Sequence, residues 1–166
     1  MRLSSAAKKA VIDKAKAIIV EKNGESHLNG ISSRFVPVDD KWGVKFTTRG
    51  NSYMSETYTR QRRGFRLGIA PFCFGIFEYT CELVGYKGEK FLATFTCYIT
   101  EIVKVLVNTY GMFYTDDVPS AFVEAIENLI NMCQEKLGFR FWDYHAQNLG
   151  INENGEIIII DWGDES

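Results

Sequence analysis

Two short apolar segments near the C-terminus, separated by a strong turn signal, constrain the fold more than any other feature of the sequence. Asn152-Glu153-Asn154-Gly155 lies between them, and Ile157 to Ile160 form an unbroken apolar run after it. Asn and Gly favour tight turns, so we expect residues 149–152 and 156–160 to pair as antiparallel strands. The run of four isoleucines is too apolar for an exposed strand and should be buried on both faces.

Oxygen-bearing side chains surround this predicted hairpin. The pairing would return Asp161 toward Asn148, while Asp143 lies in the segment just before the first strand. Carboxylate and amide oxygens suit hard cations such as magnesium. A further carboxylate could orient a hydroxyl or accept its proton. For an isolated Asp or Asn, a turn cap or a backbone hydrogen bond is the ordinary role, so only the joint pattern points to chemistry.

The rest of the chain alternates helical and β-prone patterns, which predicts an α+β fold. The predicted elements are a helix over 3–22 closed by Asn23-Gly24, strands Arg34–Val38 and Trp42–Thr47, a helix over 52–65, β-prone runs over 72–86 and 90–106, a loop over 108–119, and a helix over 121–137 capped by Ser120 and closed by Gly138. In the first helix, the apolar face is expected to include Ala6, Ala10, Ile12, Ala15, Ile18 and Ile19.

Composition excludes several classes of protein. No stretch approaches the roughly 20 apolar residues that a membrane span requires. The formal net charge of -2 over 166 residues argues against general nucleic-acid binding. The four cysteines form no CxxC pair, which favours buried thiols in a reducing cytosol over a zinc site or disulfides.

Two motifs carry a resemblance to a known family. The run Asp143-Tyr144-His145-Ala146-Gln147-Asn148, followed by Asp161-Trp162-Gly163, resembles the catalytic loop and DFG motif of the protein-kinase-like superfamily. The form is closest to aminoglycoside and choline phosphotransferases and to atypical and phage-encoded kinases. The resemblance implies ATP and Mg2+ as cofactors, with Asp143 as catalytic base and with Asn148 and Asp161 as metal ligands.

The upstream sequence supplies the other parts that this resemblance implies. Residues 28–36, with Gly30, Ser32 and Ser33, resemble a short phosphate-binding glycine loop. Trp42-Gly43-Val44-Lys45 resembles the strand that carries the phosphate-binding lysine. The remaining assignments are Glu56 as the partner of Lys45, Thr100 in the gatekeeper place, and the backbone of Glu101 and Val103 as the contact with adenine.

The implied fold is an N-lobe antiparallel sheet with a helix, and a truncated helical C-lobe that carries a catalytic β-hairpin. Its segments would be an N-terminal amphipathic helix (1–25), the N-lobe (26–103) and the C-lobe (104–166). Two departures from the family are visible. Phe141 stands where a His often precedes the catalytic Asp, and no activation segment follows Gly163 before Ser166.

The expected activity is transfer of the γ-phosphate of ATP to a hydroxyl, with Ser or Thr of a protein as the first expectation for the acceptor. The expected partners are a protein substrate or host protein and a second copy of the chain, with neither nucleic acid nor membrane. The expected location is the cytoplasm, which would be the host cytoplasm for a viral protein. A pseudokinase-like binding or inhibitory protein without turnover and an unrelated α+β domain are the alternatives.

Overall fold

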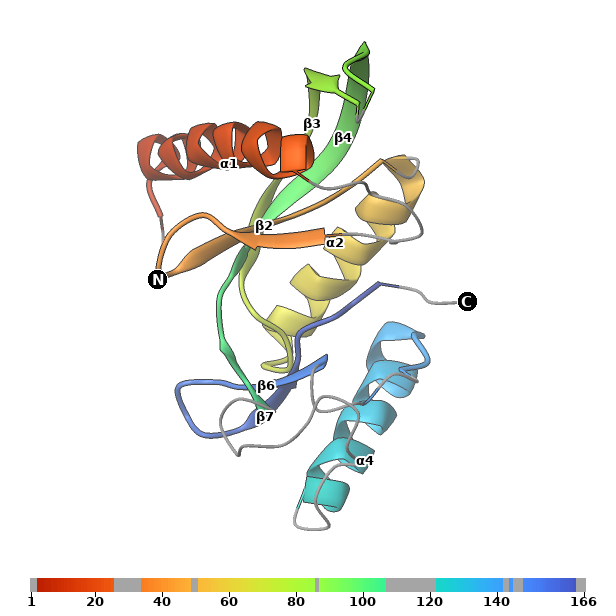
Figure 1. Cartoon of the computed structure of the whole chain (residues 1–166). Coiled ribbons are helices and arrows are strands. Elements are labelled where there is room, and N and C mark those ends of the chain that lie inside the picture. Colours follow the sequence, from red (N-terminus) through yellow and green to blue (C-terminus); the bar gives the residue numbers. More distant parts are fainter. Residues whose placement is uncertain are drawn as a thin grey trace. The chain divides into compact units, whose positions relative to one another are not determined.

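The computed structural model describes residues 3–25, 34–48, 51–85, 87–106, 122–141, 144 and 148–163 (Figure 1). The elements in chain order are α1 (Ser5–Glu25), β1 (Arg34–Pro37), β2 (Trp42–Thr47), α2 (Asn51–Arg66), β3 (Cys73–Val84), β4 (Lys90–Glu101), β5 (Lys104–Val105), α4 (Val123–Met132), the π-helical turn η2 (Cys133–Leu137), β6 (Leu149–Ile151) and β7 (Ile157–Ile159). The α+β class and the predicted order of these elements are confirmed.

The chain divides into two compact units. Unit 1 comprises Met1–Tyr58 and Cys73–Ile102, and unit 2 comprises Thr59–Phe72 and Val103–Ser166. The division falls inside α2, so the first half of this helix belongs to unit 1 and its second half to unit 2. The segment that follows α2 therefore belongs with the C-terminal part of the chain.

Unit 1 is built on a four-stranded antiparallel sheet with the order β1-β2-β4-β3. The β1–β2 hairpin forms where the sequence predicts it, because Asp39 Oδ1 accepts the backbone N–H groups of Lys41 and Trp42, both at 2.8 Å. Pro37 ends β1 at an edge of the sheet. Proline has no backbone N–H to donate, but at this position no hydrogen bond between inner strands is lost.

The helix α1 packs on one face of this sheet. Ser4 Oγ caps its first turn by accepting the N–H of Ala7 at 3.1 Å. Val11, Ala15 and Ile19 are its buried residues. Two predictions are wrong here: Ala6 and Ala10 are exposed, and the helix continues through Asn23-Gly24 to Glu25. The apolar face is narrower than the sequence pattern indicates, because alanine is too small to reveal which side of a helix is buried.

Unit 2 contains the three-stranded antiparallel sheet β5-β6-β7 and the helix α4. The predicted hairpin is confirmed and is shorter than expected, with Leu149 opposite Ile159 and Ile151 opposite Ile157. Gly155 closes its turn with a φ of 77°, and its N–H donates to the carbonyl of Asn152 at 3.0 Å. Ile158 and Ile159 are buried, whereas Ile157 and Ile160 are only partly covered.

The core of unit 2 gathers around the fully buried Trp162. The other buried side chains of this cluster come from the segment after α2, from the end of β5, from α4, η2 and the residues after η2, and from the hairpin. They are Ile69, Ala70, Leu106, Ile126, Leu129, Cys133, Phe141, Leu149 and Ile159. A backbone hydrogen bond also joins the hairpin to the segment after α2, because the N–H of Ile159 donates to the carbonyl of Ile69 at 2.9 Å.

The helix predicted over 121–137 changes its hydrogen bonding before it ends. It is α-helical to Met132 and continues as the π-helical turn η2, which Gly138 closes with a φ of 61° as predicted. The predicted cap at Ser120 and the loop over 108–119 lie outside the described residues. All four cysteines are buried, which confirms that part of the prediction. None of the described helices is long and apolar enough to cross a membrane.

Candidate functional site

The two faces of the sheet in unit 1 differ sharply in chemistry. Residues directly opposite each other in an antiparallel pair project to the same face, and neighbours along a strand project to opposite faces. The face on the α1 side carries Trp42, Val44 and Phe46 on β2, Phe95, Cys97 and Ile99 on β4, and Phe74 on β3. All seven are buried. This face is an ordinary hydrophobic core.

The other face of the same strands is polar although it is buried. Thr47 and Thr96 lie opposite each other and are 3% and 5% exposed. Lys45 lies opposite the fully buried Tyr98, and Thr100 lies opposite Gly43. We call Lys45, Thr47, Thr96, Tyr98 and Thr100 the polar row. Buried polar groups cost free energy unless they are hydrogen-bonded, and among the described residues no buried side-chain atom of this row lacks a hydrogen-bond partner.

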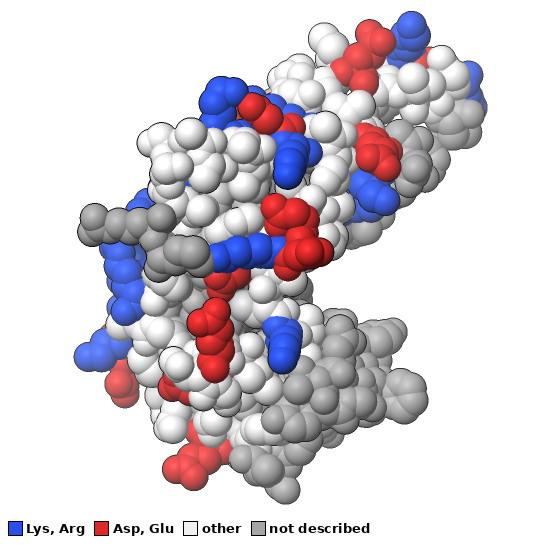
Figure 2. Space-filling view, turned by 90° about the vertical axis from the view of Figure 1, so that its left-hand side faces the viewer, with Lys and Arg blue, Asp and Glu red and all other residues white. Residues whose placement is uncertain are grey.

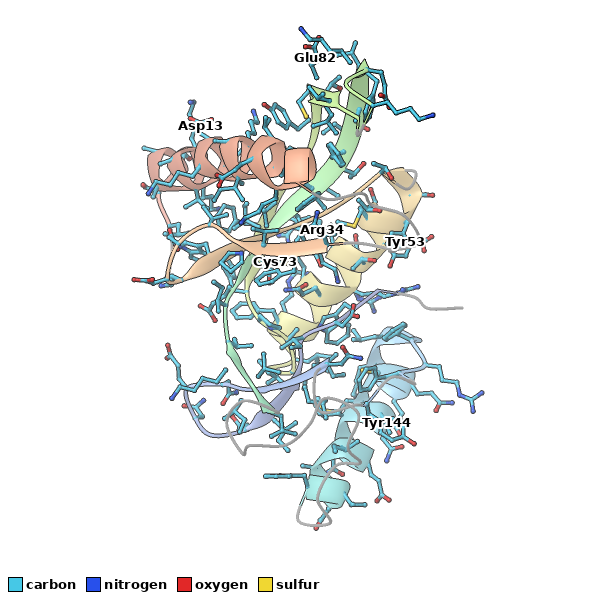
Figure 3. All side chains as sticks on the ribbon, in the orientation of Figure 1. Asp13, Arg34, Tyr53, Cys73, Glu82 and Tyr144 are labelled. Atoms are coloured by element: carbon cyan, nitrogen blue, oxygen red, sulfur yellow. The ribbon has the colours of Figure 1, made fainter. Side chains whose placement is uncertain are left out.

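Lys45 is the charged member of the polar row and is only 8% exposed. Its register partner Tyr98 packs with Met54 of α2, and the rings of Tyr58 and Tyr98 lie 5.3 Å apart. Lys45 therefore projects from the sheet face that α2 contacts. Tyr53 and Cys73, which are labelled in Figure 3, belong to the same cluster as Met54. A lysine whose neighbours on β2 and β4 carry hydroxyl groups is suited to an anionic group such as a phosphate.

Glu56, the predicted partner of Lys45, is exposed on α2 and belongs to the same unit. It lies two residues after Met54, which is fully buried against the sheet. The ion pair between Glu56 and Lys45 stays a prediction.

The β6–β7 hairpin places the backbone of the two predicted metal ligands at one of its ends. The N–H of Ile160 donates to the carbonyl of Asn148 at 3.0 Å, which extends the strand ladder by one step. Asp161 is the next residue, so Asn148 and Asp161 lie at the same end of the hairpin, as the sequence predicts. Asn148 is 8% exposed and Asp161 is half-buried. Together they offer amide and carboxylate oxygens, the donor types that magnesium prefers.

The backbone on both sides of Asp161 is fixed by hydrogen bonds. Asp161 Oδ1 accepts the N–H of Gly163 at 3.0 Å, and the indole Nε1–H of Trp162 donates to the carbonyl of Ile159 at 2.8 Å. Trp162 rests directly against Gly64 of α2, where an added Cβ would lie 2.6 Å from Cη2 of the indole. Asp161 is thus held in place by the next residue, Trp162, which is buried in the core of unit 2.

The predicted adenine-contacting segment connects the two units. Glu101 ends β4 opposite Trp42, and the N–H of Ile102 donates to the carbonyl of Lys41 at 2.8 Å. Val103 contacts the strand β6, since a Cβ on Gly150 would lie 2.9 Å from its Cγ2. A role for the backbone of Glu101 and Val103 in binding adenine stays a prediction.

The other predicted site residues belong to the glycine loop and to the segment before the hairpin. Gly30, Ser32 and Ser33 of the glycine loop lie outside the described residues, and so does the predicted catalytic base Asp143. Tyr144 is described and is 49% exposed, with its ring 6.5 Å from that of the buried Phe141.

Sequence reasoning missed the polar row and the contact between Gly64 and Trp162. A signal for the row was present, because Thr94, Thr96, Tyr98 and Thr100 alternate with apolar residues along β4. The contact had a weaker signal in the unexplained glycine near the end of a predicted helix. Neither the comparison with models of known protein families nor the search of curated proteins finds a match for this chain.

Proposed function

We propose that this protein is a phosphotransferase of minimal kinase type, which moves the γ-phosphate of ATP to a hydroxyl in the presence of Mg2+. The observation that carries the proposal is the hairpin register that sets Asn148 and Asp161 at one end of β6–β7. The buried Lys45 in its row of hydroxyl groups supports it independently.

The donor set fits the cofactors. Asn148 and Asp161 would hold magnesium through their side-chain oxygens, and Lys45 would bind phosphate oxygens through its ammonium. When bound, magnesium neutralises charge on the phosphates. The hydrogen bond from the N–H of Gly163 to Asp161 Oδ1 helps to orient this carboxylate. Positioning of this kind accounts for most of the catalysis in phosphoryl transfer.

Asp143 would accept the proton of the acceptor hydroxyl. In the transfer step, the hydroxyl oxygen forms a bond to the γ-phosphorus while the bond between that phosphorus and the β,γ-bridging oxygen breaks. ADP leaves with the bridging oxygen, and the hydroxyl proton passes to the Asp143 carboxylate. A protein Ser or Thr is the proposed acceptor, on the analogy with short phage kinases alone.

The test is transfer of labelled phosphate from γ-labelled ATP, with magnesium, to the chain itself and to dephosphorylated casein. We expect transfer by the unaltered chain, and a loss of about 100-fold or more in Asp143→Ala and in Asp161→Ala. Asp13→Ala is the matched control, because Asp13 is an exposed carboxylate on α1 whose hydrogen bond is to Lys9. Transfer that is unchanged in both site variants contradicts the proposal.

Asp143→Ala also separates turnover from the alternative of a binding protein without turnover. A phosphotransferase loses transfer in this variant while it keeps magnesium-dependent nucleotide binding. A binding protein shows no transfer in either form, and its partner binding does not change in the variant.

A further inference from the structure

The end of the β3–β4 hairpin presents one bare face. Pairing of Thr80 with Thr94, Glu82 with Leu92 and Val84 with Lys90 puts these six side chains on the same side of the two strands. All six are exposed. We call them the outer hairpin face. Figure 1 shows this part of the hairpin extending past α1, and Figure 3 labels Glu82 at its end.

The opposite side of the same strands is covered in part, since Phe91 on that side is 46% exposed. Cys81 and Leu83 alternate with the residues of the outer hairpin face and are 8% and 7% exposed. They share their side with Tyr79, whose ring lies 5.7 Å from the ammonium of Lys16 on α1. The helix α1 therefore packs on one side of the hairpin only. The outer hairpin face is the more exposed of the two sides, because all six of its residues are exposed whereas Cys81 and Leu83 on the other side are buried.

Two of the exposed residues are large and apolar. Leu92 is 74% exposed and Val84 is 53% exposed, the two largest values among the exposed large hydrophobic residues of the described chain. They are diagonal neighbours, because Leu92 pairs with Glu82 and Val84 pairs with Lys90. Single exposed apolar residues need no explanation, but two that adjoin at the end of a projecting hairpin indicate an interaction surface.

The charged residues occupy the other diagonal. Lys90 Nζ and Glu82 Oε1 lie 4.0 Å apart across the strands, and both side chains are well exposed. Figure 2 shows acidic and basic side chains close together at this end of the molecule. The four residues thus form a square with apolar groups at two opposite corners and one charge of each sign at the other two.

We propose that the outer hairpin face binds the same face of a second copy of the chain. A two-fold axis along the diagonal from Val84 to Leu92 would stack each of these residues on its own counterpart. The same rotation exchanges the charged corners, so Glu82 of each copy meets Lys90 of the other. A partner without this arrangement would leave a charge opposite an apolar group, whereas a second copy satisfies all four corners.

The face is small, so the association is concentration-dependent. Stable protein interfaces bury about 1,600 Å² in total, and two faces of six residues each fall well short of that. The proposal does not depend on phosphotransfer, since no residue of the outer hairpin face belongs to the site proposed for that activity.

The first test is sedimentation velocity of the full chain over a series of concentrations. We expect the weight-average sedimentation coefficient to rise toward that of a dimer in the unaltered chain and to stay at the monomer value in Leu92→Ser. Val123→Ser is the control, because Val123 is also exposed, at 45%, and lies on α4. A chain that stays monomeric throughout overturns the proposal, as does Leu92→Ser associating like the unaltered chain.

Charge exchange gives a sharper test of the geometry. Glu82→Lys and Lys90→Glu should each abolish self-association, because every inter-copy contact at the charged corners becomes repulsive. An equimolar mixture of the two variants should associate again, since the first variant has a lysine at both charged corners and the second has a glutamate at both. Far-UV circular dichroism checks that both variants are folded. A mixture of folded variants that stays monomeric overturns the proposal.

Discussion

At the scale of single residues, two buried thiols contribute to how the stability of the protein depends on alkaline pH. Burial raises the pKa of Cys97 to about 12, with the nearby Cys81 adding to the rise and Lys16 opposing it. Burial also raises the pKa of Cys133 to about 11. Both thiols are fully buried in the core, so they serve packing and are poor nucleophiles at neutral pH.

We predict that the free energy of unfolding falls as the pH rises above about 9. The unfolded thiol ionises near 9.0 and the folded thiol of Cys97 near 12, so the folded state binds more protons in this window. The slope from one thiol is at most about 1.4 kcal/mol per pH unit. Urea unfolding between pH 8 and 11 measures it, and Cys97→Ala should have a shallower slope. An identical slope in that variant contradicts the assignment.

The stability of the protein should also be sensitive to substitution of Gly64. In most helix interiors, Gly→Ala stabilises by about 1 kcal/mol. Here the new Cβ would lie 2.6 Å from the buried indole of Trp162 and 3.1 Å from Cβ of Ala70. Overpacking of a core costs about 1–3 kcal/mol, so we predict that Gly64→Ala destabilises the protein.

Thermal unfolding measures this effect, and a double-mutant cycle identifies its cause. The smaller ring in Trp162→Phe should reduce the cost of Gly64→Ala or reverse its sign. If Gly64→Ala raises the melting temperature of the otherwise unaltered chain, the contact between Gly64 and Trp162 is not as close as described.

At the scale of elements, α1 illustrates what holds unit 1 together. Ile19 is fully buried where α1 packs on the sheet, and Val20 beside it is 38% exposed. We predict that Ile19→Ala destabilises the protein by about 2–5 kcal/mol through lost burial and an unfilled cavity. Val20→Ala should change stability by less than about 0.5 kcal/mol. Urea unfolding of the two variants measures the difference, and equal effects would mean that α1 is not docked through Ile19.

Elements with local signals were predicted well from the sequence. Asp39 and the Asn152–Gly155 turn fix their hairpins through hydrogen bonds within a few residues, so the strands on both sides follow. The π-helical end of α4 had no such signal. There the N–H of Phe139 donates to the carbonyl of Cys133 at 3.0 Å, and Cys133 is fully buried in the core of unit 2. Such a choice depends on tertiary packing, which local sequence does not encode.

The same distinction between local and long-range signals decides which parts of the candidate site could be predicted. The sequence placed Asn148 and Asp161 at the same end of the hairpin, because a tight turn fixes the register of the two strands that it joins. The polar row was not predicted, because it requires the pairing of β2 with β4, whose sequences are separated by α2 and β3. Long-range register of this kind is set by the packing of both sheet faces.

At the scale of the whole molecule, the α+β class and the order of elements followed from the sequence, but the boundary inside α2 did not. The segment Thr59–Phe72 belongs with the C-terminal unit because Gly64, Ile69 and Ala70 pack in its core. The sequence around these residues contains no linker, so composition gave no sign of a boundary within α2.

The most direct test of the proposed function is the affinity of the full chain for ATP with and without magnesium, measured by calorimetry. The proposal predicts magnesium-dependent binding that weakens by about tenfold or more in Lys45→Met and in Asp161→Ala. Binding to Asp13→Ala should match that of the unaltered chain. If the two site variants bind ATP with magnesium as tightly as the unaltered chain, the assignment of Lys45 and Asp161 to one nucleotide-dependent function is contradicted.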